Sequence, residues 1–360
     1  MTKKTAIRTF VIFIWVALLM SLLHLPKLFD QSSERTLNIF TWGDYFESDE
    51  LIETFEKRTG IKIKFHFYSA NEELRVKLLS NKGKYDLVIP SDYAVKRLIK
   101  ENALKPLDHS KLTFMDKILP QFKNLYYDPG NVYSIPNTWE SYGLGYNKKD
   151  LEGKTILPSL SSIFDESVID YKFAMPCDPG ESIIFATTYL FGRKNRINQA
   201  EAKQVTQLLI QQKKHVEAYS DYRSKYLIQT RNCPIALVRA SLVWQIAKES
   251  NYMGYMQPKE ATFVTVENLV IPKETLKDDL IYEFINYLYE PKSQALQVGP
   301  APVYPVIKEA MQYLTEEVDE YHKDFQFSLN NAANFIFFKR LLSEEETRNL
   351  WVDVKSTSES

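Results

Sequence analysis

The stretch LNIFTWGDYF, residues 37–46, decides how the rest of the chain is interpreted. It begins as an apolar β-strand and then changes at once to Trp42, Gly43, Asp44 and Tyr45. In open α/β sheets, small ligands bind outside the carboxyl ends of the strands. Two aromatic rings beside a carboxylate at that edge indicate either a ligand site or rings that cover the end of the core. The spacing alone leaves both interpretations open.

The chain that follows alternates expected strands with expected helices. The segment 61–67, IKIKFHF, alternates apolar and basic residues as a strand with one exposed face does. A further apolar strand is expected at 85–90, and helices are expected at 50–58, 73–79 and 92–100. Three strand and helix units in succession predict a mostly parallel sheet that helices cover on both faces.

Local signals mark where these helices begin and end. Gly60 suits the left-handed position that commonly follows the last turn of a helix. Ser69 and Glu72 have the spacing of a capping box, in which two side chains satisfy backbone N–H groups reciprocally. Ser91 stands directly before the helix expected at 92–100, so we expect its hydroxyl to cap the first turn.

A second series of strands and helices occupies the later part of the chain. Strands are expected at 133–136, 143–147, 172–176, 234–238 and 262–271, and helices at 183–191, 199–214, 242–249 and 276–289. The chain has 360 residues, whereas a single core rarely grows beyond about 250 to 300 residues. The sequence therefore predicts two α/β lobes.

Composition excludes several classes of function. The chain is 44% hydrophobic and 25% charged with a formal net charge of −1, so it lacks the basic field of a nucleic-acid-binding protein. No glycine motif of dinucleotide binding, P-loop hydrolysis or esterase chemistry follows a strand. The five histidines are scattered singly, and we expect no metal or cofactor. Cys177 and Cys233 are able to form a disulfide only if the fold brings them together.

The N-terminus indicates export. Lys3, Lys4 and Arg8 precede an uncharged apolar run over residues 10–23, which has the length of a signal-peptide core and is short for a membrane span. We expect residues 1–30 to be a signal peptide. No A-x-A site or lipoprotein cysteine follows, so an uncleaved anchor remains the alternative.

Three carboxylates stand where a ligand site is expected. Asp178 and Glu181 flank Pro179 and Gly180, which matches a helix N-terminus and also suits the binding of a cation. Glu267 lies within FVTVENLVIP, an otherwise apolar strand. A charge there is costly unless it is paired or exposed at an edge, which makes Glu267 a candidate site residue.

Five segments also carry a resemblance: LNIFTWGDYF, FEKRTGIKIKF, YDLVIPSDYAVKRLIKENALKPLD, YSIPNTWESYGLGYN and LVIPKETLKDDLIYEFINYLYEP. They cover nearly the whole N-terminal lobe, whereas residues 148–262 match loosely. Together they resemble the spermidine/putrescine-binding proteins of bacterial ABC transporters. The resemblance implies the α/β type II periplasmic-binding-protein fold, two α/β lobes with a hinged ligand cleft.

The resemblance also implies ligand-contacting residues. The aromatic residue after the first strand and the tyrosine three positions later correspond to Trp42 and Tyr45, and the Pro-Ser-x-Tyr segment supplies Ser91 and Tyr93. The acids correspond to Asp178, Glu181 and Glu267. Such a set suits a polyamine, because carboxylates pair with its ammonium groups and aromatic faces contact both methylenes and cations.

The second lobe departs from the family pattern. Two further tryptophans of the family site align with Arg239 and Thr265, and a C-terminal glutamine aligns near Val352. If Arg239 enters the cleft, the ligand is shorter, displaced or not a polyamine. Trp244 offers another aromatic wall, although a tryptophan at such a position is more often part of the core.

We therefore expect a monomeric periplasmic solute-binding protein, not an enzyme, that delivers spermidine or putrescine to an ABC permease in the inner membrane. Its lobes are expected at 36–141 plus 268–310 and at 142–267 plus 311–360. One alternative is a receptor for another organic cation, an amino acid or a metal ion. A carboxylate-dependent hydrolase is a further alternative, as is a structural or sensor protein on an uncleaved anchor.

Overall fold

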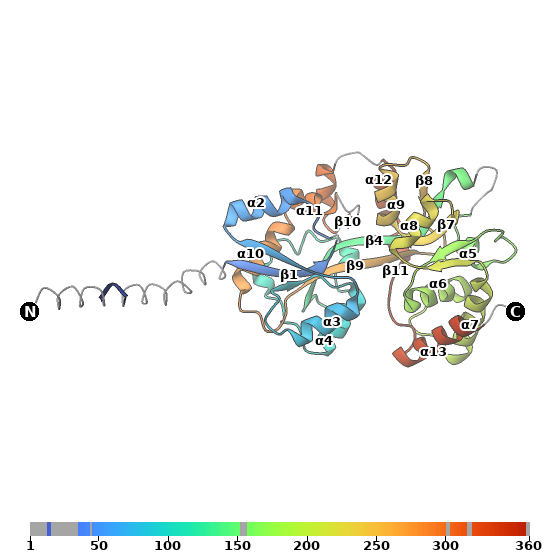
Figure 1. Cartoon of the computed structure of the whole chain (residues 1–360), viewed down its shortest axis with the longest axis horizontal. Helices are drawn as coiled ribbons and strands as arrows, with labels where there is room; N and C mark the ends of the chain where they lie inside the picture. Colours follow the sequence, from blue (N-terminus) through green and yellow to red (C-terminus); the bar gives the residue numbers. More distant parts are fainter. Residues whose placement is uncertain are drawn as a thin grey trace, which may run out of the picture.

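The computed structural model describes residues 13–15, 35–43, 45–151, 157–299, 303–314 and 319–357. The expected leader lies outside these ranges apart from residues 13–15, and so does Asp44. Within the described ranges, no helix has the length and apolarity needed to cross a membrane. Figure 1 shows two α/β lobes that share one continuous sheet, with helices packed on both of its faces.

The N-terminal lobe is built from strand and helix units, as the sequence predicts. Strand β1 (Thr36–Trp42) lies between parallel neighbours β2 (Lys62–Tyr68) and β3 (Leu87–Val88). Each strand is followed by a helix, namely α2 (Asp49–Thr59), α3 (Asn71–Ser80) and α4 (Asp92–Lys100). The carboxyl ends of the three strands therefore meet at one edge of the sheet, directly before these helices.

The helix termini confirm one expected cap and correct two others. Gly60 has φ 71° and ends α2 in the left-handed conformation, as expected. The capping box at Ser69 and Glu72 is wrong, because α3 begins after Ala70 and the Ser69 backbone and hydroxyl both bond Glu73 at 2.9 Å. Ser91 does occupy the N-cap position of α4, but its hydroxyl makes no cap hydrogen bond.

Two long antiparallel strands connect the lobes. Strand β4 (Ser134–Asn147) pairs with β9 (Thr262–Val270), and β10 (Tyr304–Pro305) pairs with β4. The expectation of two separate strands at 133–136 and 143–147 is wrong. The intervening residues continue to pair with β9 through one register shift between Pro136 and Thr138, so a single strand runs from one lobe into the other.

The second lobe completes the sheet, whose strand order is β2-β1-β3-β9-β4-β7-β5-β6. Its remaining strands are β5 (Phe173–Met175), β6 (Val216–Tyr219), β7 (Ile235–Arg239), β8 (Met253–Met256) and β11 (Phe335–Phe337). The helices of the later chain are α5 (Ser161–Phe164), α6 (Pro179–Phe191), α7 (Gln199–Lys213), α8 (Tyr222–Gln229), α9 (Ala240–Ala247), α10 (Asp278–Leu288), α11 (Pro291–Val298), α12 (Asp319–Asn330) and α13 (Glu344–Ser356).

The lobes have distinct hydrophobic cores. One core surrounds Phe40, Phe55 and Phe284 beneath β1 and α10, and another surrounds Phe173 and Phe185 beneath α6. Burial of these aromatic side chains is the main favourable term for each lobe, at roughly 25 cal/mol for each Å² of apolar surface removed from water. The first cluster also includes Ala240 and Trp244, so apolar packing continues across the crossing strands.

Candidate functional site

Two side chains near the ends of β1 and β3 donate hydrogen bonds to one carboxylate on the crossing strand β9. Trp42 donates its indole N–H to Glu267 Oε2 at 2.9 Å, and Ser91 donates its hydroxyl to Glu267 Oε1 at 2.8 Å. The Ser91 hydroxyl that does not cap α4 is therefore used here. Three predicted site residues from distant parts of the sequence form one hydrogen-bonded group.

The surroundings of Glu267 favour a proton on its carboxyl group. Burial raises the pKa of Glu267 to about 7, while the hydrogen bonds from Ser91 and Trp42 and the charge of Arg239 lower it. The charge of a second carboxylate, Glu140, raises it further. A cation bound beside Glu267 would favour the ionised form, because an opposite charge at close range stabilises it.

Tyr45 lies below this edge and is 8% exposed. Its hydroxyl shares a hydrogen bond with Thr138 Oγ1 at 2.9 Å, accepts one from Asn137 Nδ2 at 2.7 Å and is 3.3 Å from Gln297 Nε2. These contacts fasten the loop after β1 to strand β4 and favour a positioning role for Tyr45. Its direct contact with a ligand stays a prediction.

The paired strands place further polar groups on one face of the sheet. In the register of β4 and β9, Thr138 is opposite Glu267 and Glu140 is opposite Thr265. Residues two apart on a strand share a face, so Glu140 and Glu267 lie on the same side. Arg239 stands at the end of β7, and its Nη1 is 3.2 Å from Glu140 Oε1.

Glu140 is a site residue that the sequence interpretation missed. It is buried, and among the described residues its Oε2 atom has no hydrogen-bond partner. A buried acid in β4 is as costly as Glu267 is within β9, but the polar neighbours of Glu140 hide this signal in the sequence. What the sequence did not reveal is that β4 continues unbroken through this position.

The opposite wall comes from the first turn of α6. Asp178 Oδ1 accepts hydrogen bonds from the backbone N–H groups of Gly180 at 2.7 Å and Glu181 at 3.1 Å, so the helix-cap interpretation of Asp178 is confirmed. Tyr142 donates its hydroxyl to Glu181 Oε1 at 3.0 Å. The other oxygen, Glu181 Oε2, is buried and has no hydrogen-bond partner within the described part of the chain.

Burial and neighbouring acids also raise the pKa values of the carboxyl groups in this wall. Burial, then the charges of Asp178 and Asp221, raise the pKa of Glu181 well above its usual value, whereas Arg239 lowers it. Burial likewise raises the pKa of Asp178. The charge of Arg340 lowers the pKa of Asp178. A cation bound beside these two carboxyl groups would relieve their mutual repulsion.

Tyr93 is the residue of the N-terminal lobe that lies beside Asp178 and Glu181. It stands in the first turn of α4, is 36% exposed, and its hydroxyl accepts a hydrogen bond from Asn71 Nδ2 at 2.7 Å. Tyr93 lines a cavity of about 330 Å³ together with Asp178 and Glu181. Burial and the charges of these two acids raise the pKa of its phenol. One lobe therefore presents an aromatic ring to the carboxylates of the other.

Two of the aligned positions, Thr265 and Val352, and the alternative aromatic residue Trp244 have different surroundings. Thr265 is buried on the sheet face beside Glu140. Val352 is 56% exposed on α13 and lines the cavity that contains Tyr93. Trp244 is buried, and its ring lies 5.6 Å from that of Tyr255, which agrees with the expectation of a core residue.

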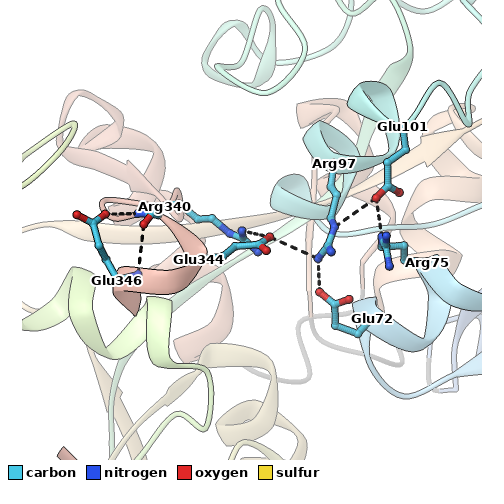
Figure 2. Close-up of polar contacts among 8 residues, drawn as sticks. Glu72, Arg75, Arg97, Glu101, Arg340, Glu344 and Glu346 are labelled. Carbon is cyan, nitrogen blue, oxygen red and sulfur yellow. Dashed lines mark hydrogen bonds and ion pairs between the residues drawn. The ribbon is translucent and has the colours of Figure 1, made fainter. Parts of the chain in front are cut away.

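A chain of ion pairs joins the lobes beside this cavity (Figure 2). Arg97 on α4 contacts Glu72, lies 3.6 Å from Glu101, and lies 3.8 Å from Glu344 at the start of α13. Glu344 also pairs with Arg340. These partly exposed charges border a second cavity of about 680 Å³, which residues of both lobes line. The network is a polar contact between lobes at the rim of the site.

A family model matches most of the chain. Residues 50–327 match the family model described as bacterial extracellular solute-binding protein. The chain belongs to this family. The resemblance implied by the sequence is thereby confirmed at the level of the family.

Individual relatives of this solute-binding protein have related names. It is 29% identical over 266 residues to the putrescine/cadaverine-binding protein of Pseudomonas aeruginosa, covering 71% of this chain and 74% of that one. It is 27% identical over 281 residues to the putrescine-binding periplasmic protein PotF of Escherichia coli, covering 72% and 75% of the two chains.

Solved structures share the fold of this solute-binding protein. A putative spermidine/putrescine ABC transporter protein from Listeria monocytogenes superimposes with a TM-score of 0.75 at 26% identity, over 89% of this chain and 99% of that one. The PotD protein of Streptococcus pneumoniae gives a TM-score of 0.78 at 23% identity, over 89% and 98% of the two chains. The prediction of a type II periplasmic-binding-protein fold is confirmed.

Cys177 and Cys233 are free thiols, and the Cys177 thiol donates to Asp221 Oδ2 at 2.9 Å. Among the described residues of this solute-binding protein, no group of three or more histidine, cysteine, aspartate or glutamate side chains is arranged to hold a metal ion.

Proposed function

We propose that this chain is an exported receptor that captures a polyamine between its lobes and delivers it to an ABC permease in the inner membrane. The names of its relatives support this ligand class, since they include putrescine/cadaverine-binding and spermidine/putrescine-binding proteins. The proposal requires binding and release only, so no residue performs bond chemistry.

One observation carries the choice of ligand: four acidic side chains come together where the lobes meet, while Lys339, Arg340 and Arg348 also line the cavity that contains Asp178 and Glu181. Glu267, Glu140, Glu181 and Asp178 converge from β9, β4 and α6, whereas Arg239 is the cation that lowers the pKa of both Glu267 and Glu181. Trp42 and Tyr93 add aromatic faces. A linear cation suits such walls, because ammonium groups pair with carboxylates and methylenes pack on rings.

Capture is proposed to proceed by hinge closure. The two lobes, 36–141 plus 268–310 and 142–267 plus 311–360, would open and close about the crossing segments at 138–143, 265–268 and 303–307. A few residues at element ends commonly absorb the backbone changes of such a motion. Trp42, Ser91 and Tyr93 would approach the ligand from one lobe, and Asp178 and Glu181 from the other.

Export and location follow from the N-terminal pattern. Residues 1–30 would direct the chain to the periplasm, where it would act as a monomer, and would retain it at the inner membrane if they were not removed. Two relatives are named periplasmic proteins, which supports this location.

A receptor for another small ligand is the second candidate, and Arg239 is the observation that favours it. A guanidinium is an established partner for carboxylates, so an amino acid is the natural competitor. Its carboxylate would, however, face Glu140, Glu267 and Glu181 as well, and like charges at close range disfavour binding.

A thermal-shift panel tests the proposal. The purified chain is heated with putrescine, spermidine, an amino acid without side-chain charge and a neutral sugar, each at millimolar concentration. A ligand that binds only the folded state raises the melting temperature. We expect a shift with at least one polyamine and none with the sugar or the amino acid. A shift with the amino acid alone would contradict the proposal and favour the second candidate.

A further inference from the structure

Glu140 and Arg239 form an ion pair on the sheet face, between Glu267 on one side and Glu181 on the other. Glu140 lies two residues from Thr138, which pairs with Glu267, and two residues from Tyr142, which bonds Glu181. Arg239 is opposite Tyr142 in the register of β4 and β7. The order along the sheet face is therefore Glu267, then the ion pair, then Glu181.

The more exposed member of the pair is the positively charged one. The side chain of Arg239 is 22% exposed and that of Glu140 is 6% exposed, with 3.2 Å between Nη1 and Oε1. Glu140 is thus covered, and the guanidinium is the part that a ligand meets. An arginine keeps its charge at any pH at which the protein is folded, so this positive charge is permanent. The effect of Arg239 on the titration of both Glu267 and Glu181 agrees with a position between them.

We propose that the Arg239–Glu140 ion pair selects ligands that carry positive charge only at their two ends. This inference rests on the proposed polyamine function and narrows it to diamines. The terminal ammonium groups of a diamine reach Glu267 at one end and Asp178 with Glu181 at the other, while its methylenes pass the guanidinium. Spermidine has an additional inner ammonium, which meets the guanidinium of Arg239.

Comparing two amines of equal length separates the effect of ligand charge from the effect of ligand length. Diaminooctane has the chain length of spermidine, but a methylene group replaces the inner ammonium. If length alone limited the ligand, both compounds would be rejected equally. If the guanidinium rejects the inner charge, diaminooctane binds and spermidine binds weakly.

The test is a calorimetric titration of the purified chain with putrescine, diaminooctane and spermidine. We expect the wild-type chain to bind diaminooctane at least about tenfold more tightly than spermidine, the loss expected when a ligand charge faces an unfavourable partner. Arg239→Gln uncovers the Glu140 carboxylate, so it should reverse this order by improving spermidine binding. Glu140→Gln combined with Arg239→Gln removes both charges and should abolish the reversal.

The outcomes distinguish this inference from the proposed function. Equal affinity of the wild-type chain for diaminooctane and spermidine, or tighter binding of spermidine, would overturn the selective role of the pair while leaving polyamine binding intact. Absence of binding by all three amines would overturn the proposed function itself. Because the wild-type comparison decides the matter, the test stands even if Arg239→Gln does not fold.

Discussion

Trp42 and Glu267 are 225 positions apart in the sequence, yet the indole N–H of the first lies 2.9 Å from Oε2 of the second. The contact fastens the end of β1 to the strand that crosses between the lobes. It also places an aromatic face beside a carboxylate whose pKa burial raises to about 7. An aromatic wall and a counter-charge for an ammonium group are thereby combined at one point.

Removing this donor should weaken ligand binding. Trp42→Phe keeps an aromatic face but loses the N–H, and a hydrogen bond to a charged group contributes about 1.5 to 3 kcal/mol. We therefore expect affinity for putrescine to fall about tenfold or more in calorimetric titration. Unchanged affinity would mean that the bond only supports the fold.

Ser91 provides a matched pair of variants for the same carboxylate. Ser91→Ala removes the second donor to Glu267, a bond of 2.8 Å. Ser110→Ala removes an exposed hydroxyl that bonds Asp108 at 2.6 Å, far from the cleft. The first variant should lower putrescine affinity severalfold, and the second should leave it as in the wild type. Equal effects would argue against a role for Ser91 in the site.

Binding should strengthen as pH rises through 7. Burial raises the pKa of Glu267 to about 7, so the empty site loses a proton over the interval in which a cationic ligand requires the ionised form. We expect putrescine affinity to increase between about pH 6 and pH 8, and Glu267→Gln to bind weakly with a flatter profile. An affinity that falls over this interval would contradict the assignment.

The stability of the unliganded chain should change in the opposite direction. A carboxyl group with a raised pKa in the folded state binds more protons there than in the unfolded state, so the free energy of unfolding decreases as pH rises between the two pKa values. For Glu267 the folded-state pKa is about 7, and the ordinary pKa of a glutamate side chain is 4.5. Denaturant titrations at pH 5 and pH 7.5 measure the difference.

Asp324 provides a control for the predicted pH dependence of both putrescine affinity and stability. Burial raises its pKa to about 6, and its carboxylate accepts hydrogen bonds from Tyr304 and from Gln257 at 2.9 Å. Asp324→Asn should flatten the pH dependence of stability without changing that of putrescine affinity. If the pH dependence of putrescine affinity also changed in this variant, the assignment of that dependence to Glu267 would be wrong.

Asp178 combines a cap with a proposed ligand contact, and one substitution separates them. Asparagine caps helices about as well as aspartate, so Asp178→Asn should retain nearly all stability. Loss of its charge should weaken putrescine binding by about tenfold, or roughly 1.4 kcal/mol. Asn198→Ala, at the capping box of α7, should do the reverse, lowering stability by about 1 kcal/mol with no effect on affinity. If Asp178→Asn bound putrescine with wild-type affinity, Asp178 would act only as the helix cap.

The ion pairs between lobes should make a small, salt-dependent contribution to closure. Exposed pairs contribute about 0 to 1 kcal/mol and are screened by salt. Arg97→Gln, which removes the contact with Glu344 at 3.8 Å, should therefore lower putrescine affinity no more than about fivefold at low ionic strength. The difference from the wild-type chain should vanish near 1 M salt. A loss that persists in high salt would indicate a structural role for Arg97.

The sequence predicts the parts of the site that depend on local pattern. Trp42 and Ser91 follow strands, and an acid such as Glu267 within an apolar strand requires compensation, so each is recognisable without the fold. Tyr45 differs, because its burial depends on Thr138 and Gln297, which come from separate segments. No local sequence pattern distinguishes a tyrosine that contacts a ligand from one that is buried behind the ligand-contacting residues.

The missed residue and the missed pairing have the same physical origin. The sequence pattern predicts a break in β4 at the polar residues after Pro136, although pairing with β9 continues through them. Once the strand is continuous, Glu140 falls on the face shared with Glu267, and its pairing with Arg239 depends on the neighbour β7. Register between strands distant in sequence is a tertiary property, so neither feature follows from local propensity.

Calorimetric titration of the purified chain with putrescine at pH 8, repeated with Glu267→Gln, tests the central claim most directly. The account predicts one molecule of putrescine bound per chain at submillimolar concentration by the wild-type protein, and at least about tenfold weaker binding by the variant. Absence of heat with putrescine and every other polyamine, in a chain that is folded by circular dichroism, would contradict it.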